Sequence, residues 1–311
     1  MEYRRLGGAG IRLSAIGVGG WLTFGRTLDQ DAVRATVRAA IDVGVTFFDL
    51  ADVYAKGAAE TAFGAALGEH RRQDLVISSK AFWPMSENPN DRGLSRKHLF
   101  ESVEGSLRRL GTDYLDLYFC HRFDPETQVE ETVRAMEDLI HQGKVLYWGT
   151  SVWEADQIED AVGVAERLGA FAPRVEQPRY NMLDRHIEPT IMPACARHGI
   201  GLVVWSPLAE GMLTGKYDHG IPPDSRAATD ERMRSSIQPG DVERVRDLGR
   251  IAREADVPLA QLALAWCLRR PEITTVITGA SRPGHVADNA AAAELALDAD
   301  VLDRIEALLL D

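Results

Sequence analysis

The sequence has 311 residues and a hydrophobic content of 45%, which fits one large or two small domains with an ample core. Its formal net charge of −12, with no basic block, argues against nucleic acid as a partner. No apolar run approaches the roughly 18 residues of a membrane span, no signal-peptide core follows Met1, and the three widely spaced cysteines suit a reducing cytosol, so we predict a cytoplasmic protein without membrane insertion.

The chain begins with a predicted β-hairpin, whose strands at 3–6 and 11–13 flank a glycine-rich turn. A strand over 15–18 follows, and Gly20 and Trp21 lie just after it. The glycines here either let a ligand approach the backbone or simply form a turn, and the adjacent tryptophan favours the ligand. Next comes a helix with Asp29 as its N-cap and Gly44 as its stop signal.

The segment 46–80 contains two short apolar strands on either side of one helix, which is the pattern of a parallel strand, crossover and strand. Asp49 ends the first strand, Tyr54 lies in the loop after it, and Lys80 ends the second strand. The carboxyl ends of parallel barrel strands form one face. We therefore expect an acid, a phenol and an amine to meet there.

These three groups suit proton transfer. A tyrosine has an unperturbed pKa of about 10, and a nearby ammonium favours the phenolate, so we expect Lys80 to lower the pKa of Tyr54. Asp49 would hold Lys80 charged and in place. Such a phenol can protonate a carbonyl oxygen as a hydride reaches the carbon. The alternative, a helix cap, a rim aromatic and a solvated strand end, explains each residue alone but not the three together.

Strands and helices continue to alternate along the rest of the chain. The predicted helices are 95–110, 130–142, 154–168, 187–198, 259–270 and 283–292. The predicted strands are 114–119, 146–149, 174–176, 201–204 and 275–277, with a long irregular stretch after 204. Together with the strands near 16, 47 and 77 this makes eight. The sequence therefore predicts an α/β fold, a (β/α)8 TIM barrel forming a single domain over 1–311, with the N-terminal hairpin capping its bottom.

His121 follows a predicted strand and so shares the position of the acid and the amine. A histidine there can bind a substrate carbonyl and orient it toward the phenol, whereas a lone histidine is more often a satisfied core or rim residue; its position favours the functional role. Trp21, Trp83, Tyr54 and His121 could line a partly aromatic substrate pocket. The two tryptophans could instead be packing residues.

The Rossmann fingerprint is absent, because no Gly-x-Gly-x-x-Gly motif follows a strand. A nicotinamide cofactor must then be held by loops at the top of the barrel. Trp205 ends the seventh strand and offers a flat face for nicotinamide, although it could equally be core packing. Ser151 and Gln177, at two other strand ends, could bind the carboxamide.

The segment 206–226 is rich in proline and glycine and carries Lys216 and Arg226. A loop of this length at a barrel mouth is usually functional. Its cations could pair with a pyrophosphate and a ribose 2′-phosphate, which would favour NADPH over NADH. Taken separately, they could also be ordinary surface charges on a solvated loop.

Several stretches resemble the aldo-keto reductase superfamily, whose members transfer hydride from NADPH to aldehydes and ketones. Phe-Phe-Asp-Leu-Ala-Asp-Val-Tyr at 47–54 and Ser-Ser-Lys at 78–80 are similar to its signature. The stretches at 93–98, 147–151, 205–209 and 215–218 are most similar to the branch of voltage-gated potassium channel β subunits and related bacterial reductases. The resemblance runs from Arg5 to about Asn289.

The resemblance implies a catalytic tetrad of Asp49, Tyr54, Lys80 and His121, although channel β subunits carry Asn in place of this histidine. It also implies NADP(H) as cofactor, a small-molecule carbonyl substrate, no metal, and a possible homo-oligomer, tetrameric or larger. His285 stands where those subunits have Gln. The implied cofactor-binding positions are Gly20, Trp21, Asp49, Ser151, Gln177, Trp205, Ser206, Pro207, Leu208, Gly211, Lys216, Arg226, Gly279, Ser281, His285, Asp288 and Asn289.

We therefore predict an NADPH-dependent reductase of aldehydes or ketones, sugar-derived carbonyls among them, with Tyr54 as general acid. One alternative is an NADPH-binding regulatory subunit of a membrane channel or transporter. The presence of His121, and a chain that starts at the hairpin without a pore-blocking extension, favour the reductase. A non-catalytic sugar-binding barrel leaves the charged trio unexplained. Nothing in the sequence selects among carbonyl substrates.

Overall fold

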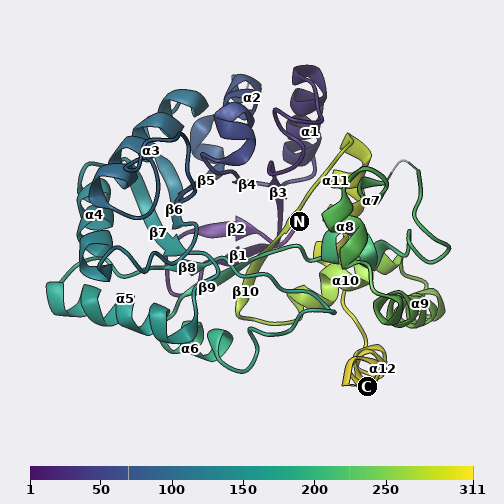
Figure 1. The fold of residues 1–311 in the computed structure, drawn as a ribbon. Coiled ribbons are helices and arrows are strands. Elements are labelled where there is room, and N and C mark those ends of the chain that lie inside the picture. The colour runs from purple at the N-terminus through teal and green to yellow at the C-terminus, as the bar shows by residue number, and fades with distance from the viewer. Residues whose placement is uncertain (69, 224, 311) are drawn as a thin grey trace.

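A computed structural model describes residues 1–68, 70–223 and 225–310, and its centre is a closed barrel of eight parallel strands surrounded by helices (Figure 1). Neighbouring strands pair in the order β10-β3-β4-β5-β6-β7-β8-β9, and β9 pairs with β10 to close the barrel. The predicted (β/α)8 fold is confirmed. The strands are β3 (Ile16–Gly19), β4 (Phe47–Asp49), β5 (Val76–Ala81), β6 (Leu115–Cys120), β7 (Val145–Thr150), β8 (Val175–Glu176), β9 (Gly201–Trp205) and β10 (Ile273–Thr278).

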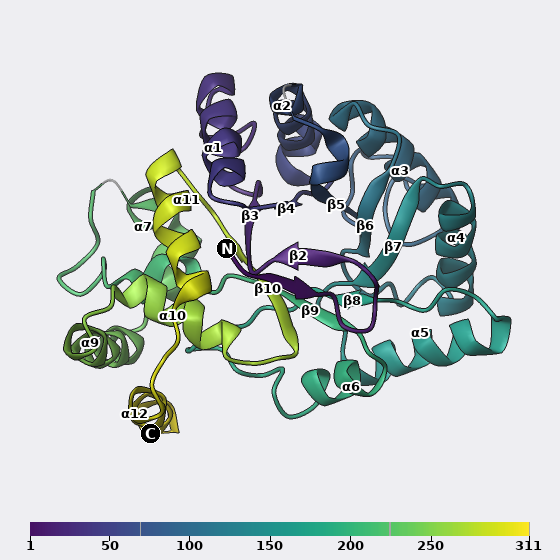
Figure 2. The ribbon, with the colours of Figure 1, turned by 180° about the vertical axis from the view of Figure 1, so that it is seen from behind.

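The predicted N-terminal hairpin forms and closes one end of the barrel (Figure 2). Its strands, β1 (Tyr3–Arg5) and β2 (Arg12–Ser14), pair antiparallel. Leu6 and Leu13 are fully buried in one cluster with inward-facing residues of the barrel strands. The N–H of Gly8 donates to the carbonyl of Gly199, just before β9, at 2.8 Å. The hairpin therefore caps the amino ends of the strands, as predicted, and leaves their carboxyl ends free.

Eight helices of the outer layer correspond to predicted ones. The apolar face of each packs against the strands, and Asp29 caps the first helix by accepting a hydrogen bond from the N–H of Ala32 at 2.8 Å. The helices are α1 (Gln30–Asp42), α2 (Ala58–Leu67), α3 (Arg96–Leu110), α4 (Val129–His141), α5 (Ala155–Leu168), α6 (Ile191–Arg197), α10 (Leu259–Leu268) and α11 (Pro283–Ala290).

Three predictions about helices were wrong. The helix predicted over 187–198 begins only at Ile191, and the one predicted over 283–292 ends at Ala290, followed by the short helix η4 (Ala291–Glu294). The stretch after 204 is not continuously irregular. It contains η3 (Ala209–Thr214), α7 (Arg226–Thr229), α8 (Glu231–Ser236) and α9 (Pro239–Glu254). In α9, residues 245, 248, 251 and 252 are buried, a helical spacing that the sequence already shows.

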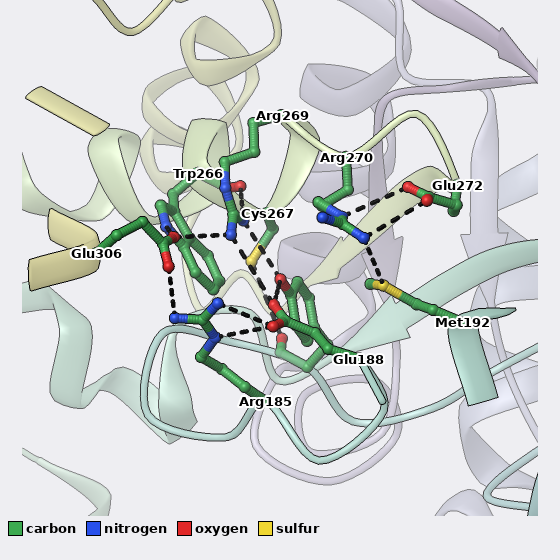
Figure 3. A network of polar contacts seen from close by, with 10 residues as sticks. Arg185, Glu188, Met192, Trp266, Cys267, Arg269, Arg270, Glu272 and Glu306 are labelled. Carbon is green, nitrogen blue, oxygen red and sulfur yellow. Dashed lines mark hydrogen bonds and ion pairs between the residues drawn. The ribbon is translucent and has the colours of Figure 1, made fainter. Parts of the chain in front are cut away.

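A further helix that we did not predict, α12 (Ala299–Leu310), is joined to the barrel by a charged network (Figure 3). Glu306 of this helix accepts hydrogen bonds from Arg185 at 2.7 Å and from Arg269 at 2.9 Å. The Trp266 indole N–H also donates to Glu306, and the Arg269 guanidinium lies 3.6 Å from the centre of the Trp266 ring. No described helix is long and apolar enough to cross a membrane.

Candidate active site

The four residues predicted to act in catalysis meet at the carboxyl ends of neighbouring strands. Asp49 is the last residue of β4, Lys80 lies one residue before the end of β5, and His121 directly follows β6. Tyr54 begins the short helix η1 (Tyr54–Gly57) after β4. All four side chains are buried, Tyr54 and His121 being 8% exposed. The end of the barrel that the hairpin leaves free therefore carries these groups together.

Lys80 joins the acid and the phenol. Its ammonium donates to both carboxylate oxygens of Asp49, at 2.8 and 2.7 Å, and to the hydroxyl of Tyr54 at 3.1 Å. It also donates to the carbonyl of Leu50 at 2.7 Å. A buried charge needs such compensation, because an uncompensated one would cost several kcal/mol. The order Asp49, Lys80, Tyr54 is thus fixed by hydrogen bonds.

Asp49 is held by more than its ion pair. The Ser78 hydroxyl and the Gln177 side-chain amide each donate to its Oδ1 at 2.8 Å. Gln177 comes from the loop after β8, on the far side of the barrel, so the carboxylate ties distant strands together. The sequence did not indicate this link, because residues 128 apart gave no signal of contact.

The predicted direction of the Tyr54 pKa was wrong. Burial and the neighbouring Asp49 carboxylate raise the pKa of Tyr54 well above its ordinary value, while the Arg122 guanidinium lowers it. Burial also lowers the pKa of Lys80, against the opposing effect of Asp49. The ammonium is already matched by the Asp49 carboxylate, so it has little net charge to offer the phenol. Tyr54 is therefore a protonated phenol at neutral pH, which is the form that donates a proton.

The backbone after Tyr54 is strained. Ala55, Lys56 and Gly57 have φ angles of 49°, 53° and 89°, three consecutive left-handed residues. Such conformations cost about 1–3 kcal/mol for residues other than glycine. Gly57 suits glycine because its φ is 89°, and a Cβ there would also press on the Arg109 side chain, 2.7 Å from its Cδ. The Lys56 ammonium donates to the carbonyl of residue 84 and so holds the turn from outside.

His121 lies beside Tyr54 at the barrel mouth. The two rings meet edge to face with their centres 5.9 Å apart. Burial, followed by the positive charges of Lys80 and Arg122, lowers the pKa of His121 well below its ordinary value, so the imidazole is neutral. Its Nδ1 is buried and has no hydrogen-bond partner among residues 1–68, 70–223 and 225–310. A buried polar atom without a partner is costly, and a bound ligand would supply one.

The two tryptophans predicted to contact substrate are the most open of these groups. Trp83 is 39% exposed and lies edge to face with His121, the ring centres being 6.3 Å apart. Trp21 is 44% exposed in the turn after β3. Large exposed aromatic side chains beside a buried polar cluster are typical of a ligand-binding rim.

Three residues predicted to hold nicotinamide lie on the same face. Trp205 ends β9 and is partly buried, with the Arg179 guanidinium 5.7 Å from its ring centre. The Ser151 hydroxyl donates to the carbonyl of Gln177 at 2.9 Å, and the Gln177 amide donates to Asp49. Ser151 and Gln177 are therefore already engaged with neighbouring groups, and a carboxamide would have to share or exchange these hydrogen bonds.

Gly20 has a packing explanation. Its N–H donates to the carbonyl of Asp49 at 3.0 Å, which links β3 to β4 beyond their last paired residues. A Cβ at this position would lie 2.8 Å from both Leu50 and Phe24. Packing alone thus requires glycine here, a reason that is neither of the two that the sequence offered.

The loop after β9 has an unusual backbone. Ser206, Ala209 and Glu210 have positive φ angles of 56°, 47° and 57°. The Ser206 hydroxyl accepts a hydrogen bond from the N–H of Glu210 at 3.1 Å, and the Asn181 side chain donates to the Ser206 carbonyl at 3.0 Å. These bonds hold the turn at 206–210, which includes the predicted positions Pro207 and Leu208, in one strained shape.

The predicted phosphate-binding cations lie in this loop, in different surroundings. Arg226 pairs with Glu210 at 2.7 Å, so its charge is compensated. Lys216 has no carboxylate within ion-pair distance in the described part of the chain, and it lies against Gly211, whose added Cβ would be 2.7 Å from the ammonium. Lys216 is therefore the cation more available to an anion.

The loop after β10 brings a third cation to this region. Arg282 donates to Nε2 of His285 at 2.8 Å, and Ser281 lies 3.3 Å from Nδ1 of the same ring. Burial, then Arg282, lowers the pKa of His285, and Lys216 adds to this effect. Beside them, Gly279 and Asp288 are exposed, and the Asn289 side chain is buried. This donor set fits an anionic group.

Sequence reasoning missed two residues of the site besides Arg282. Arg122 follows His121, and Glu176 precedes Gln177. Glu176 is fully buried and accepts hydrogen bonds from the Thr150 hydroxyl at 2.5 Å and from the N–H of Val152 at 2.7 Å, which holds Val152 at a φ of 57°. Burial raises the pKa of Glu176 to about 7. In both cases the signal was a charged residue at a strand end next to a predicted site residue.

The described residues hold no group of three or more His, Cys, Asp or Glu side chains that could bind a metal ion. All three cysteines are buried and unpaired, and burial raises the pKa of each thiol, which makes them unreactive.

Residues 15–310 match the family described as "Aldo/keto reductase family". Proteins from Oryza sativa subsp. japonica and Arabidopsis thaliana, each named "Probable voltage-gated potassium channel subunit beta", are 46% identical to this chain, over 99% of it and 97% of their own length. A "Putative voltage-gated potassium channel subunit beta" from Schizosaccharomyces pombe is 40% identical over 99% of this chain and 93% of its own. These matches confirm the resemblance, including the branch, that the sequence motifs indicated.

Proposed function

Because this chain belongs to the aldo/keto reductase family, we propose that it is an NADPH-dependent reductase of aldehydes or ketones, sugar-derived carbonyls among them. Family membership supports an oxidoreductase in general. The observation that carries the finer proposal is the hydrogen bond from the Lys80 ammonium to the Tyr54 hydroxyl, 3.1 Å long, at the open end of the barrel. A protonated phenol that accepts a hydrogen bond from an ammonium and lies beside a neutral histidine can donate a proton to a carbonyl oxygen, as a carbonyl reductase requires.

Each residue has one proposed task. His121 binds the carbonyl oxygen of the substrate and turns it toward the Tyr54 hydroxyl, which gives its proton to that oxygen. The cofactor, when bound, supplies the hydride that the carbonyl carbon takes up. Tyr54 is left as a phenolate, whose oxygen accepts the 3.1 Å hydrogen bond from the Lys80 ammonium, and Asp49 keeps Lys80 in position. The product is an alcohol.

The residues of the loops after β9 and β10, together with Ser151 and Gln177, fit NADP(H) by their chemistry. Trp205 would stack against the nicotinamide, and Ser151 and Gln177 would bind its carboxamide. Lys216, Arg226 and the Ser281–His285 segment would bind phosphates, since they supply two guanidinium groups, one of them that of Arg282, and an ammonium; Lys216 and Arg282 both act on the His285 ring. Asp288 and Asn289 would contact adenine. We retain Gly20, Trp21, Gly211 and Gly279 as backbone contacts.

The names of the relatives favour a second candidate, a regulatory subunit of a channel that binds NADPH with little turnover. The strained turn after Tyr54 favours an enzyme, because a site that only binds a cofactor would not need to hold the Tyr54 hydroxyl in place with such a turn. Cytoplasmic location, a single domain and a homo-oligomer remain predictions from the sequence.

The test is oxidation of NADPH by the purified protein with a panel of aldehydes, ketoses and keto sugars, with NADH in parallel. We expect turnover with at least one chemical class and a preference for NADPH. Tight binding of NADPH with no turnover on any carbonyl would contradict the reductase and favour the regulatory subunit. In that case, recovery of the protein with a membrane channel would identify the partner.

A further inference from the structure

Arg122 stands at the edge of the candidate active site and has no assigned task. It follows His121 and is half-buried, and its guanidinium donates a hydrogen bond to the His121 carbonyl. The same guanidinium lies 5.6 Å from the centre of the Trp83 ring, on a side chain that also contacts His121. Arg122, Trp83 and His121 therefore form one continuous rim next to Tyr54.

The charge of Arg122 is not compensated by a nearby acid. Within the described ranges no carboxylate lies within ion-pair distance of its guanidinium, whereas Lys80 has both oxygens of Asp49. Glu176 acts on Arg122 only through space, because its own oxygens are taken by Thr150 and by backbone N–H groups. The neutral His121 adds no charge. The open rim of the site is therefore positive, on a protein with a net charge of −12.

An unpaired, half-buried guanidinium is an expensive arrangement unless an anion completes it. Burial lowers the pKa of Arg122, and the group remains charged because an arginine starts far above neutral pH. Guanidinium groups bind carboxylates and phosphates through two parallel hydrogen bonds, and one of its nitrogens is already committed to the His121 carbonyl. The guanidinium lies 5.6 Å from the centre of the exposed Trp83 ring, so its remaining donors are at the same rim.

We propose that the carbonyl substrate carries an anionic group, a carboxylate or a phosphate, which binds Arg122 while the carbonyl oxygen meets Tyr54 and His121. This inference rests on the proposed reductase function and names the substrate class for the same site. Binding at two points would fix the carbonyl in one orientation, and orientation is a large part of the rate that an enzyme gains. Trp83 would pack against the carbon atoms of the substrate that lie between its carbonyl and its anionic group.

The test compares matched pairs of substrates that differ only in the anionic group. Succinic semialdehyde is compared with butanal for the carboxylate, and glyceraldehyde 3-phosphate with glyceraldehyde for the phosphate. Each pair is measured as a ratio of kcat/KM in the wild type, Arg122→Gln, Arg122→Lys and Arg167→Gln. Arg167, exposed in the last turn of α5 at the opposite end of the barrel, loses the same charge and serves as the control.

We expect the wild type to prefer one anionic member by on the order of 10- to 100-fold, through a rise in KM for the neutral one. Arg122→Gln should abolish that preference, so that the ratio of kcat/KM within the responding pair falls to about one. Arg122→Lys should keep part of it, and Arg167→Gln all of it. The pair that responds identifies carboxylate or phosphate. A wild type without preference, or a variant that slows both members equally, would overturn the inference and leave Arg122 a structural residue.

Two further measurements keep the test decisive. If Arg122→Gln does not fold, the wild-type preference should still weaken as salt rises, because added ions screen a partly exposed charge; a preference independent of salt would count against the inference. If no carbonyl is turned over, the proposed function fails instead. Titration with 4-hydroxybutyrate and with 1-butanol, followed by tryptophan fluorescence, then decides whether Arg122 binds the anion: equal affinities would overturn it.

Discussion

Two regions of the same barrel face are built in opposite ways. Asp49, Lys80 and Tyr54, from β4, β5 and the loop between them, are buried and bonded to one another, with Lys80 donating to both other residues. The loops after β9 and β10 carry the exposed cations Lys216 and Arg282, of which Arg282 donates to the His285 ring, and the partly buried Arg226, which pairs with Glu210. The first region is complete in itself, whereas in the second Lys216 has no carboxylate within ion-pair distance among the described residues.

This difference leads us to assign the reaction to the first region and cofactor binding to the second. A buried ion pair holds its geometry whether or not substrate is present, because breaking it would leave a bare charge in the core. Exposed cations cost little to leave unpaired and are free to change partners. We therefore expect substitutions in the first region to act on stability and turnover, and substitutions in the second to act on cofactor affinity.

The largest effect on stability should follow Lys80→Met. The substitution leaves the Asp49 carboxylate buried with only the neutral donors Ser78 and Gln177. We expect the free energy of unfolding to fall by about 3–5 kcal/mol, measured by urea denaturation. Lys97→Met, which removes an exposed pair with Glu101 on α3, is the control and should cost less than about 1 kcal/mol. Equal losses in the two variants would remove the distinction between the regions.

A second buried carboxyl lies behind the Tyr54 loop and should make stability depend on pH. Asp52 is fully buried; its Oδ2 accepts from the Ser102 hydroxyl at 2.7 Å, and its Oδ1 has no partner among the described residues. Burial raises the pKa of Asp52 to about 7, whereas the unfolded chain has about 3.9. Between these values the folded protein binds one proton more than the unfolded chain.

The free energy of unfolding contributed by Asp52 should therefore fall as pH rises through this window, by up to roughly 4 kcal/mol, and stay level above about pH 7. The side chain in Asp52→Asn cannot ionise. The free energy of unfolding of this variant should therefore be highest relative to the wild type at about pH 8 and closest to it at about pH 4. Denaturation at several pH values measures this. A difference between the two proteins that is the same at every pH would contradict the raised pKa.

The smallest effect belongs to the second region. Arg226→Gln should raise the dissociation constant for NADPH by roughly 10- to 100-fold, with a smaller change for NADH and little change in unfolding. Glu210→Gln, which frees Arg226 from its acid, should leave NADPH affinity equal or higher. Fluorescence titration measures both variants. Unchanged affinity in Arg226→Gln would mean that the Arg226–Glu210 pair is only structural.

The sequence predicted the barrel, the hairpin and the meeting of four candidate side chains at one end of the barrel, because each depends on a short local pattern. Asp49, Lys80 and His121 all lie at strand ends, and parallel strands bring their ends together whatever the details of the loops. A positional rule of this kind needs no knowledge of side-chain contacts. The same rule would have found Arg122 and Glu176 had every charged strand end been weighed.

The features that the sequence could not predict depend on contacts between residues far apart in the chain, or on opposing effects on a pKa. The bond from Gln177 to Asp49 joins opposite parts of the barrel. The pKa of Tyr54 depends first on how deeply the phenol is buried and then on the opposing charges of Asp49 and Arg122, and only the folded structure shows this burial and these distances. The packing of Gly20 against Leu50 and Phe24 required the folded turn.

The most direct test of the account is Tyr54→Phe, which removes only the hydroxyl that Lys80 contacts. Its NADPH affinity should stay close to that of the wild type, since the ring and the second region are intact. Turnover of the best carbonyl substrate should fall by on the order of 100- to 10,000-fold, the contribution typical of a general acid. Turnover unchanged from the wild type would contradict the assignment of Tyr54 as the proton donor.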